Sequence, residues 1–329
     1  MSKLLVITCI LLTALSVDPR VNVLPDKTKA PVFGVLTNPI IENFKEGFGT
    51  NASHYIASSY IKFLEMSGAR VIPILSNSTK AEVDQLLGWV NGVLFTGGDY
   101  PFWVENNKQP VLTPEYAATG CYIYEQVQAL YKKGTILPLW ATCLGFELIH
   151  ICARNEFDTI SNFTGMPSYS RKNTFTKNAH KSAIFSYTKE VAKTAMRILS
   201  KNEVSLLGHN FGISPKTYEN NRVLRETFEI LSTMKDHEGK EFVGMIEARN
   251  APIFGTQFHP EKNSFEFFKE SYPHDSEGIF AMTFLSNFVV NLGKKNGNMF
   301  PTDELNKRLI YNWPPVFVNY MFMTISLFN

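Results

Sequence analysis

A cysteine in the middle of the chain stands where a nucleophile would be placed. The apolar run at 137–142 ends at Cys143, and Gly145 follows before apolar residues repeat at helical spacing. A strand that turns sharply into a helix exposes the residue at the turn and aims the first helical N–H groups at a bound ligand. A thiol in that position tends to have a lowered pKa. We therefore predict that Cys143 is a nucleophile, the alternative being a small buried apolar residue.

A histidine and a glutamate downstream could complete the chemistry. An apolar strand at 253–258 leads to His259, and Glu261 follows with Pro260 between them. A thiol needs a base to take its proton, and the base needs an acceptor on its other ring nitrogen. The turn expected at Pro260 allows the two side chains to face each other. We predict that His259 is the general acid and base and that Glu261 orients it.

A glycine pair upstream could supply hydrogen-bond donors. The buried-type strand Gly92–Phe95 is followed by Thr96, Gly97 and Gly98. Paired glycines after a strand often mark only a turn, but they can also leave backbone N–H groups free to bind an oxyanion. We predict that the N–H groups of Gly98 and Leu144 form this oxyanion hole. Each motif alone is a weak signal, but the three together, each at the end of a predicted strand, specifically indicate a site with a cysteine nucleophile.

At this point the sequence resembles the γ-glutamyl hydrolase family of the class I glutamine amidotransferase-like superfamily. The resemblance rests on Thr-Cys-Leu-Gly-Phe-Glu at 142–147, on Gln-Phe-His-Pro-Glu-Lys at 257–262, and on segments 33–36, 55–62, 68–73 and 94–98. These segments occur in the family's order across 31–313. Glutaminases of the superfamily usually carry Gln at the position of Glu147, so Glu147 favours the hydrolase branch.

The resemblance implies an activity and a site. It implies hydrolysis of γ-glutamyl amide bonds in folate and antifolate poly-γ-glutamates by a Cys-His-Glu triad. The sequence contains no metal-ligand cluster, and we expect neither a cofactor nor a metal. The resemblance also places His209 on the substrate side of the site. The partner it implies is the small-molecule substrate, with a homodimer as a further possibility.

The pattern of elements predicts an α/β fold. Strands are expected at 32–37, 70–75, 92–95 and 136–141, and helices at 53–66, 79–90, 115–132 and 276–292, with a hairpin formed by 228–234 and 241–247. This alternation predicts a mainly parallel sheet with helices on both faces, of the flavodoxin-like, class I glutamine amidotransferase-like type. Sites in such sheets lie beyond the carboxyl ends of the strands, so one crevice could hold all three motifs.

The N-terminus reads as a secretory signal peptide at 1–17, with Lys3 before an apolar run. We expect a lead-in at 18–30, a catalytic domain at 31–313 and a tail at 314–329 that packs on the domain. Three sequons begin at Asn51, Asn77 and Asn162 and predict a glycoprotein of the lysosome, the vacuole or the extracellular space. Three cysteines remain after the signal, and whether Cys121 pairs with Cys152 is left open; both are expected on helices.

The composition and net charge of the chain disfavour some classes of binding partner. The chain has 329 residues, 44% of them hydrophobic, and a formal net charge of +2 without a sustained basic run. This argues against nucleic acid or an anionic membrane as the main partner. The apolar tail is too short and interrupted to span a bilayer. Among basic residues, Arg171, Lys172 and Lys177 on a predicted loop at 161–181 are candidates to bind the substrate's carboxylates.

Two other functions are compatible with the motifs. A glutaminase that passes ammonia to a synthase would use the same triad, although the signal peptide and Glu147 argue against it. A secreted binding protein could keep the fold without activity, but the joint presence of Cys143, His259 and Glu261 argues against that.

Overall fold

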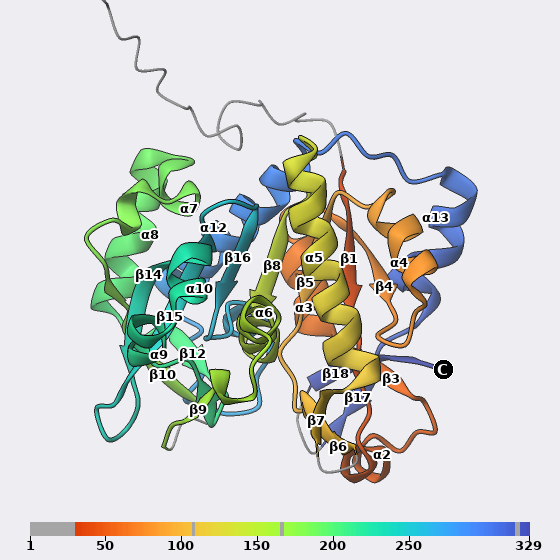
Figure 1. The fold of residues 1–329 in the computed structure, drawn as a ribbon, viewed down its shortest axis with the longest axis horizontal. Coiled ribbons are helices and arrows are strands. Elements are labelled where there is room, and N and C mark those ends of the chain that lie inside the picture. The colour runs from red at the N-terminus through yellow and green to blue at the C-terminus, as the bar shows by residue number, and fades with distance from the viewer. Residues whose placement is uncertain (1–29, 107–108, 165–167, 320–322) are drawn as a thin grey trace, which may run out of the picture.

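The computed structural model describes residues 30–106, 109–164, 168–319 and 323–329. The predicted signal peptide at 1–17 and the lead-in up to residue 29 lie outside the described residues. Figure 1 shows a central sheet with helices packed against it.

Eight strands form the central sheet, in the order β11-β14-β15-β16-β8-β5-β1-β4. Their bounds are β1 Val32–Leu36, β4 Arg70–Ile74, β5 Gly92–Phe95, β8 Leu139–Thr142, β11 Thr174–Phe175, β14 Phe228–Lys235, β15 Glu241–Ala248 and β16 Ile253–Thr256. The five strands from β16 to β4 pair in parallel, whereas β11, β14 and β15 join antiparallel. The predicted α/β class, the mainly parallel sheet and the predicted hairpin are confirmed.

Helices cover both faces of this sheet, because side chains alternate along each strand. In β5, Val93 and Phe95 join one buried cluster and Leu94 joins the other. The helices are α2 Glu42–Phe48, α3 Ser58–Glu65, α4 Lys80–Leu87, α5 Thr119–Lys132, α6 Leu144–Arg154, α7 Ala183–Ser186, α8 Lys189–Lys201, α9 Pro215–Asn220, α10 Arg222–Thr227, α11 Lys262–Phe265, α12 Ser276–Gly293 and α13 Thr302–Arg308.

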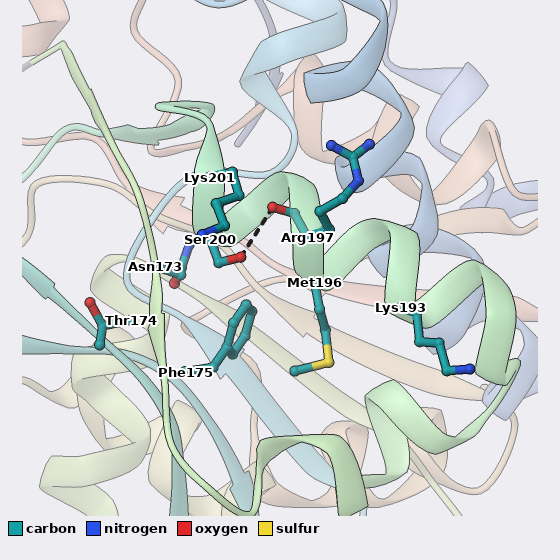
Figure 2. Close-up of a pocket in the computed structure, with 8 residues that line it drawn as sticks. All are labelled: Asn173, Thr174, Phe175, Lys193, Met196, Arg197, Ser200 and Lys201. Atoms are coloured by element: carbon teal, nitrogen blue, oxygen red, sulfur yellow. Dashed lines mark hydrogen bonds between the residues drawn. The ribbon is translucent and has the colours of Figure 1, made fainter.

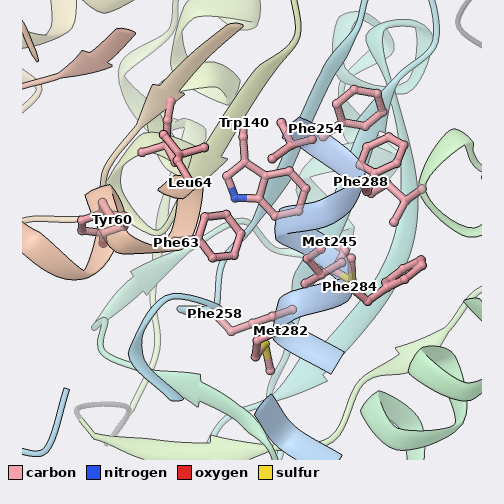
Figure 3. Close-up of a cluster of buried hydrophobic side chains, with 14 of the residues drawn as sticks. Tyr60, Phe63, Leu64, Trp140, Met245, Phe254, Phe258, Met282, Phe284 and Phe288 are labelled. Atoms are coloured by element: carbon pink, nitrogen blue, oxygen red, sulfur yellow. The ribbon is translucent and has the colours of Figure 1, made fainter. Parts of the chain in front are cut away.

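One of these clusters is strongly aromatic. Figure 3 shows Trp140 of β8 and Phe254 of β16 between Phe63 of α3 and Phe288 of α12. The ring of Phe254 meets that of Phe288 edge to face at 4.9 Å between centroids. Aromatic side chains of this size dominate the energetics of a core, so the packing fixes the strands whose ends carry the motifs.

A second, antiparallel sheet lies beside the first, in the order β17-β18-β3-β2. Its strands are β2 Asn38–Pro39, β3 His54–Ala57, β17 Val316–Val318 and β18 Met323–Phe328. The segment 314–329 therefore contacts the domain through pairing of β18 with β3, from Ile325 opposite Ala57 to Phe328 opposite His54.

Several predicted elements are corrected. The helix predicted at 53–66 is a strand, β3, followed by α3, because β2 and β18 pair with its first residues. The helix predicted at 115–132 begins with one π turn, Pro114–Ala118, before α5. The loop predicted at 161–181 contains short strands β9 Ser161–Asn162, β10 Tyr169–Arg171 and β11, which pair with β13 Phe211–Gly212, β12 Ser205–Leu207 and β14. Distant partners decide all of these pairings.

The last long helix agrees with its prediction except at one residue. Helix α12 begins after Asp275, whose side chain accepts the Gly278 N–H at 2.8 Å. Along its four-residue repeat of apolar side chains, Phe284, Phe288 and Leu292 are buried, whereas Phe280 is exposed. The buried stripe of this helix therefore begins one turn after Phe280.

Candidate active site

The predicted motifs meet at one edge of the sheet. Strands β16, β8 and β5 are adjacent and parallel, so their carboxyl ends lie together. His259 follows β16, Cys143 follows β8, and Gly97 follows β5. The single crevice predicted from the strand ends is therefore present, and Figure 1 shows these strands side by side.

Cys143 lies in a strained turn between β8 and α6. Its φ is 52° and its ψ is −108°, a left-handed region that non-glycine residues seldom adopt. The Cys143 N–H donates to Thr256 O, and the Gly145 N–H donates to Thr96 O, so strands on both sides hold the turn. A Cβ at Gly145 would lie 2.6 Å from Cβ of Phe95, which explains why glycine is required there. Strain held in this way is typical of a nucleophile elbow.

His259 and Glu261 face each other across the turn at Pro260. Nδ1 of His259 lies 2.6 Å from Oε1 of Glu261, and both side chains are buried. An ionised carboxylate only accepts hydrogen bonds, so Nδ1 carries the proton and donates it. That tautomer leaves Nε2 as the free base of the ring. Tyr60 of α3, which the motif analysis did not single out, adds a contact at 3.2 Å from its hydroxyl to the same Nδ1.

Gly97 separates the nucleophile from the histidine. A Cβ built on Gly97 would lie 2.8 Å from Cε1 of His259, 3.1 Å from Cβ of Cys143 and 2.4 Å from the Tyr60 hydroxyl. The Gly97 N–H donates to that hydroxyl at 2.8 Å. Cys143 and His259 thus approach the same point from neighbouring strands, and only glycine leaves room between them.

Of the two predicted oxyanion donors, Gly98 lines the same cleft as the thiol and Leu144 directly follows Cys143. The Leu144 N–H is the first of helix α6 and is directed at the Cys143 sulfur. The Gly98 N–H has no hydrogen-bond partner within the described part of the chain. Asn38 fixes this glycine loop, because its Nδ2 donates to Thr96 Oγ1 at 2.7 Å and to Gly97 O at 2.8 Å. Both N–H groups are therefore available to a developing negative charge.

The electrostatics of the thiol differ from the expectation. Burial raises the pKa of Cys143 well above its usual value, and the carboxylate of Glu261 raises that pKa further. Glu147 acts in the same direction only above its own raised pKa, where it is ionised. The charge of Lys262 and the Leu144 N–H act in the opposite direction but do not prevail. The resting thiol is therefore neutral, and a base must remove its proton during attack.

Glu147 lies on the first turn of α6 and is also buried. Burial raises the pKa of Glu147 to about 8, although Gln257 Nε2 donates to its Oε1 at 2.9 Å. Glu147 is thus largely protonated at neutral pH. A neutral carboxyl adds no full negative charge beside the nucleophile, which would otherwise oppose thiolate formation.

A cleft of about 390 Å³ opens over these residues. Cys143, His259, Gly97 and Gly98 line its floor. Its walls include Tyr55 of β3 and Met323 of β18 from the second sheet, Phe44 and Phe48 of α2, and the pair formed by Lys262 and Glu266. Lys262 stands directly after Glu261 in the sequence, a position that could have indicated its place in the site.

His209 lies behind the wall of this cleft. Leu207 and Gly208 line the cleft, whereas the buried ring of His209 packs against Phe242 and its Nδ1 donates to Phe211 O at 2.5 Å. Burial lowers the pKa of His209 to about 3, so the ring is neutral. The His209 side chain therefore does not line the cleft, whereas the two residues before it do, and a contact between His209 and the substrate stays a prediction.

The three basic candidates for binding carboxylates do not line the cleft either. Arg171 stacks over Tyr169, 3.7 Å from the ring centroid, and its Nη1 donates to Ser170 O. Lys172 and Lys177 lie on the same stretch and do not line the cleft. Lys262 is the lysine that the structure brings to the site instead.

A second depression lies elsewhere, between β11 and α8 (Figure 2). Phe175 and Met196 line it together with Lys193 and Arg197, which pair with Glu190 and Glu277. It contains none of the predicted site residues. Within the described ranges, no group of three or more His, Cys, Asp or Glu is arranged to hold a metal ion. No helix in that part of the chain is long and apolar enough to cross a membrane.

Cys121 and Cys152 form a disulfide, a pairing that spacing alone did not determine. It joins α5 to α6, the helix that begins next to Cys143. Both cysteines lie on helices as expected. Cys143 remains as the buried free thiol among the described cysteines.

Comparisons with known proteins identify the family of this chain. Residues 31–261 match the family model described as peptidase C26. The chain is 34% identical to γ-glutamyl hydrolase B of Dictyostelium discoideum, over 87% of this chain and 79% of the relative. It is 30% identical to γ-glutamyl hydrolase of Homo sapiens, over 89% of this chain and 87% of the relative. A solved structure of a glutamine amidotransferase from Methylobacillus flagellatus is 10% identical to this chain, with a TM-score of 0.45. The match covers 83% of this chain and 98% of that structure. The resemblance seen in the motifs is confirmed, and the chain belongs to the peptidase C26 family.

Proposed function

We propose that this protein is a cysteine hydrolase that cleaves γ-glutamyl amide bonds, with folate and antifolate poly-γ-glutamates as substrates. The support for the reaction is the family and the names of the relatives. The observation that carries the site is the approach of Cys143 and His259 on either side of Gly97, with His259 hydrogen-bonded to Glu261.

The reaction follows from the protonation states. The Cys143 thiol is neutral, so Nε2 of His259 takes its proton as the sulfur attacks the γ-carbonyl carbon. The N–H groups of Gly98 and Leu144 stabilise the oxyanion that forms. The imidazolium then gives its proton to the leaving amine, and the C–N bond breaks to leave a thioester on Cys143. His259 next deprotonates a water molecule, which attacks the thioester and restores the thiol.

The folate part of the proposal comes from the family resemblance, and the aromatic lining of the cleft supports it. Phe44 and Phe48 stack at 5.5 Å between ring centroids, and Phe48 meets Tyr55 edge to face at 5.1 Å. All three line the cleft. A wall of aromatic rings favours an aromatic group such as the pteroyl or p-aminobenzoyl part of a folate.

We further propose that the protein enters the secretory pathway and resides in the lysosome, the vacuole or the extracellular space. The disulfide between Cys121 and Cys152 is typical of an oxidising compartment. The sequon residues Asn51, Asn77 and Asn162 are all exposed and so accessible to glycosylation. A homodimer remains a prediction, for which size-exclusion chromatography with light scattering of the mature protein is the measurement.

The test of the function is incubation of the mature protein with a folate pentaglutamate, with Cys143→Ala and His237→Asn in parallel. His237 lies on the exposed hairpin turn and serves as the control histidine. We expect wild type and His237→Asn to shorten the polyglutamate chain and Cys143→Ala to leave it intact, and the product lengths will show whether cleavage is endo or exo. Free glutamine turned over faster than the pentaglutamate would support a glutaminase. No turnover of either substrate by folded wild type would support a binding protein.

A further inference from the structure

The pair of charges beside the nucleophile has no assigned task in the reaction. Lys262 is the first residue of α11, and Glu266 follows that helix, so the two side chains meet at i and i+4. Lys262 Nζ pairs with Glu266 Oε2, and Glu266 Oε1 accepts the hydroxyl of Ser59 at 2.6 Å. Both charged side chains line the cleft and are largely buried.

The pair stays ionised despite burial. Burial lowers the pKa of Lys262, but the carboxylates of Glu266 and Glu261 outweigh it and raise that pKa overall. Burial raises the pKa of Glu266, but Lys262 and Ser59 hold that pKa below its usual value. The cleft therefore contains a fixed ammonium at neutral pH.

This ammonium has donors to spare. A lysine ammonium carries three N–H groups, and its bond to Glu266 uses one. No second acceptor for Nζ is present among the described hydrogen bonds. The carboxylate of Glu266 is committed on both oxygens, to Lys262 and to Ser59. The exposed side of the pair is therefore its positive side, which suits an anionic group of a ligand.

A γ-glutamyl substrate brings such a group close to the nucleophile. The residue that is attacked at its γ-carbonyl carries an α-carboxylate only a short aliphatic chain away. Apart from His259, Lys262 is the one basic side chain among the described residues that line the cleft, which also holds Asp99 and Glu266. Without a cation, these carboxylates would repel the substrate.

We propose that the Lys262 ammonium binds the α-carboxylate of the γ-glutamyl residue attacked by Cys143, with Glu266 and Ser59 holding Lys262 in place. This inference rests on the proposed function and names the substrate group that the site selects. Lys262 and Cys143 line the same cleft, so the ammonium lies on the side of the thiol that the substrate approaches. An ammonium fixed before binding loses little entropy when the substrate arrives.

The test uses two chromogenic substrates that differ at one group. The first is an N-acylated γ-glutamyl p-nitroanilide with a free α-carboxylate, and the second is its α-carboxamide. Neither leaving group carries a carboxylate, so the comparison reports only on the acyl side. We expect wild type to prefer the carboxylate by about 10- to 100-fold in kcat/KM, as for a hydrogen bond to a charged group. In Lys262→Met this preference should disappear, because kcat/KM should fall for the carboxylate substrate and stay unchanged for the carboxamide.

Two variants separate binding from support of the fold. Lys262→Met and Glu266→Gln both break the ion pair, but only the first removes the ammonium. Glu266→Gln keeps an amide oxygen that can accept from Lys262 and so hold it in place, and it should keep the carboxylate preference. Lys269→Met, which changes an exposed lysine of the same segment, should keep it as well. If Lys262→Met does not fold, Lys262→Gln, which can still bond to Glu266, carries the same expectation.

The outcomes are distinct. Equal losses on both substrates in Lys262→Met and Glu266→Gln would mean that the pair is structural only, and the inference would be overturned while the hydrolase proposal stands. An unchanged preference in active Lys262→Met would overturn it as well. Wild type that turns over neither substrate would contradict the proposed function, and this inference with it.

Discussion

The parallel half of the central sheet and the small antiparallel sheet contribute differently to the same cleft. The ends of β5, β8 and β16 bring Gly97, Cys143 and His259 to its floor. The second sheet contributes wall residues, Tyr55 from β3 and Met323 from β18. Reacting groups thus come from strands buried on both faces, which hold positions tightly, whereas the wall comes from a sheet assembled from both ends of the chain. This contrast predicts that changes to the floor alter kcat and changes to the wall alter KM.

The largest effect should come from Glu261→Gln. An amide can donate to Nδ1 of His259 and so stabilise the tautomer with its proton on Nε2, which cannot act as a base. We expect kcat to fall on the order of 10³- to 10⁴-fold with little change in KM. Glu270→Gln, at an exposed position of the following loop, should have no effect. Steady-state kinetics measure this effect, and only a small decrease in kcat would show that Glu261 does not orient His259.

Gly97→Ala should have the next largest effect. The added methyl group would contact the Tyr60 hydroxyl, Cε1 of His259 and Cβ of Cys143, and displace at least one of them. Misplacement by about 1 Å costs on the order of 10²-fold in rate. Gly297→Ala is the matched control, because nothing lies within 4 Å of a Cβ there. Equal kinetic constants for both variants would show that Gly97 is not a point of close approach.

The helix behind the floor should depend on its disulfide. Cys121 and Cys152 are separated by 31 residues, and a loop of that size constrains the unfolded chain by about 3–4 kcal/mol. Replacing both cysteines by serine should lower the free energy of unfolding by about that amount. Denaturant unfolding measures it, with reduced wild type as the comparison. An unchanged midpoint would mean that packing alone holds α5 against α6.

Acid should weaken the same helix through His150. Burial lowers the pKa of His150 to about 4, and its ring bonds to Phe146 O and to the Tyr218 hydroxyl. Below pH 6.5 His150 becomes protonated in the unfolded chain but stays neutral in the folded protein. The free energy of unfolding therefore decreases as the pH falls toward 4. Relative to His150→Gln, wild type should lose on the order of 3 kcal/mol between those pH values. A parallel pH dependence of the two melting curves would contradict this.

The smallest effect should come from the wall. Truncation in Met323→Ala removes apolar contact with a bound substrate but leaves the floor in place. We expect KM to rise by up to about tenfold, the equivalent of about 1.4 kcal/mol, with kcat nearly unchanged. Met299→Ala, at a side chain that is 83% exposed, is the control. A fall in kcat instead would contradict the assignment of kcat to the floor residues and KM to the wall residues.

Local pattern was sufficient for the floor of the site. Cys143, His259 and Gly97 each follow a short apolar strand, and parallel strands must end at one edge, so their meeting followed from strand order and polarity. The same reasoning could not place His209, because the direction of a loop side chain depends on what packs against it. It also missed Tyr60, whose hydroxyl reaches His259 from a helix far away in sequence.

The sequence by itself determined the α/β class, the parallel strands and the three motifs, because hydrophobic periodicity and glycine placement act over a few residues. Tertiary structure decided the rest. Residues 54–57 are a strand because β2 and β18 supply hydrogen-bond partners. The Cys143 thiol is neutral because burial and nearby carboxyls outweigh the helix terminus. Lys262 became a site residue because the fold aims it into the cleft beside Glu266. Pairing, burial and charge proximity depend on residues distant in sequence, and a linear pattern does not contain them.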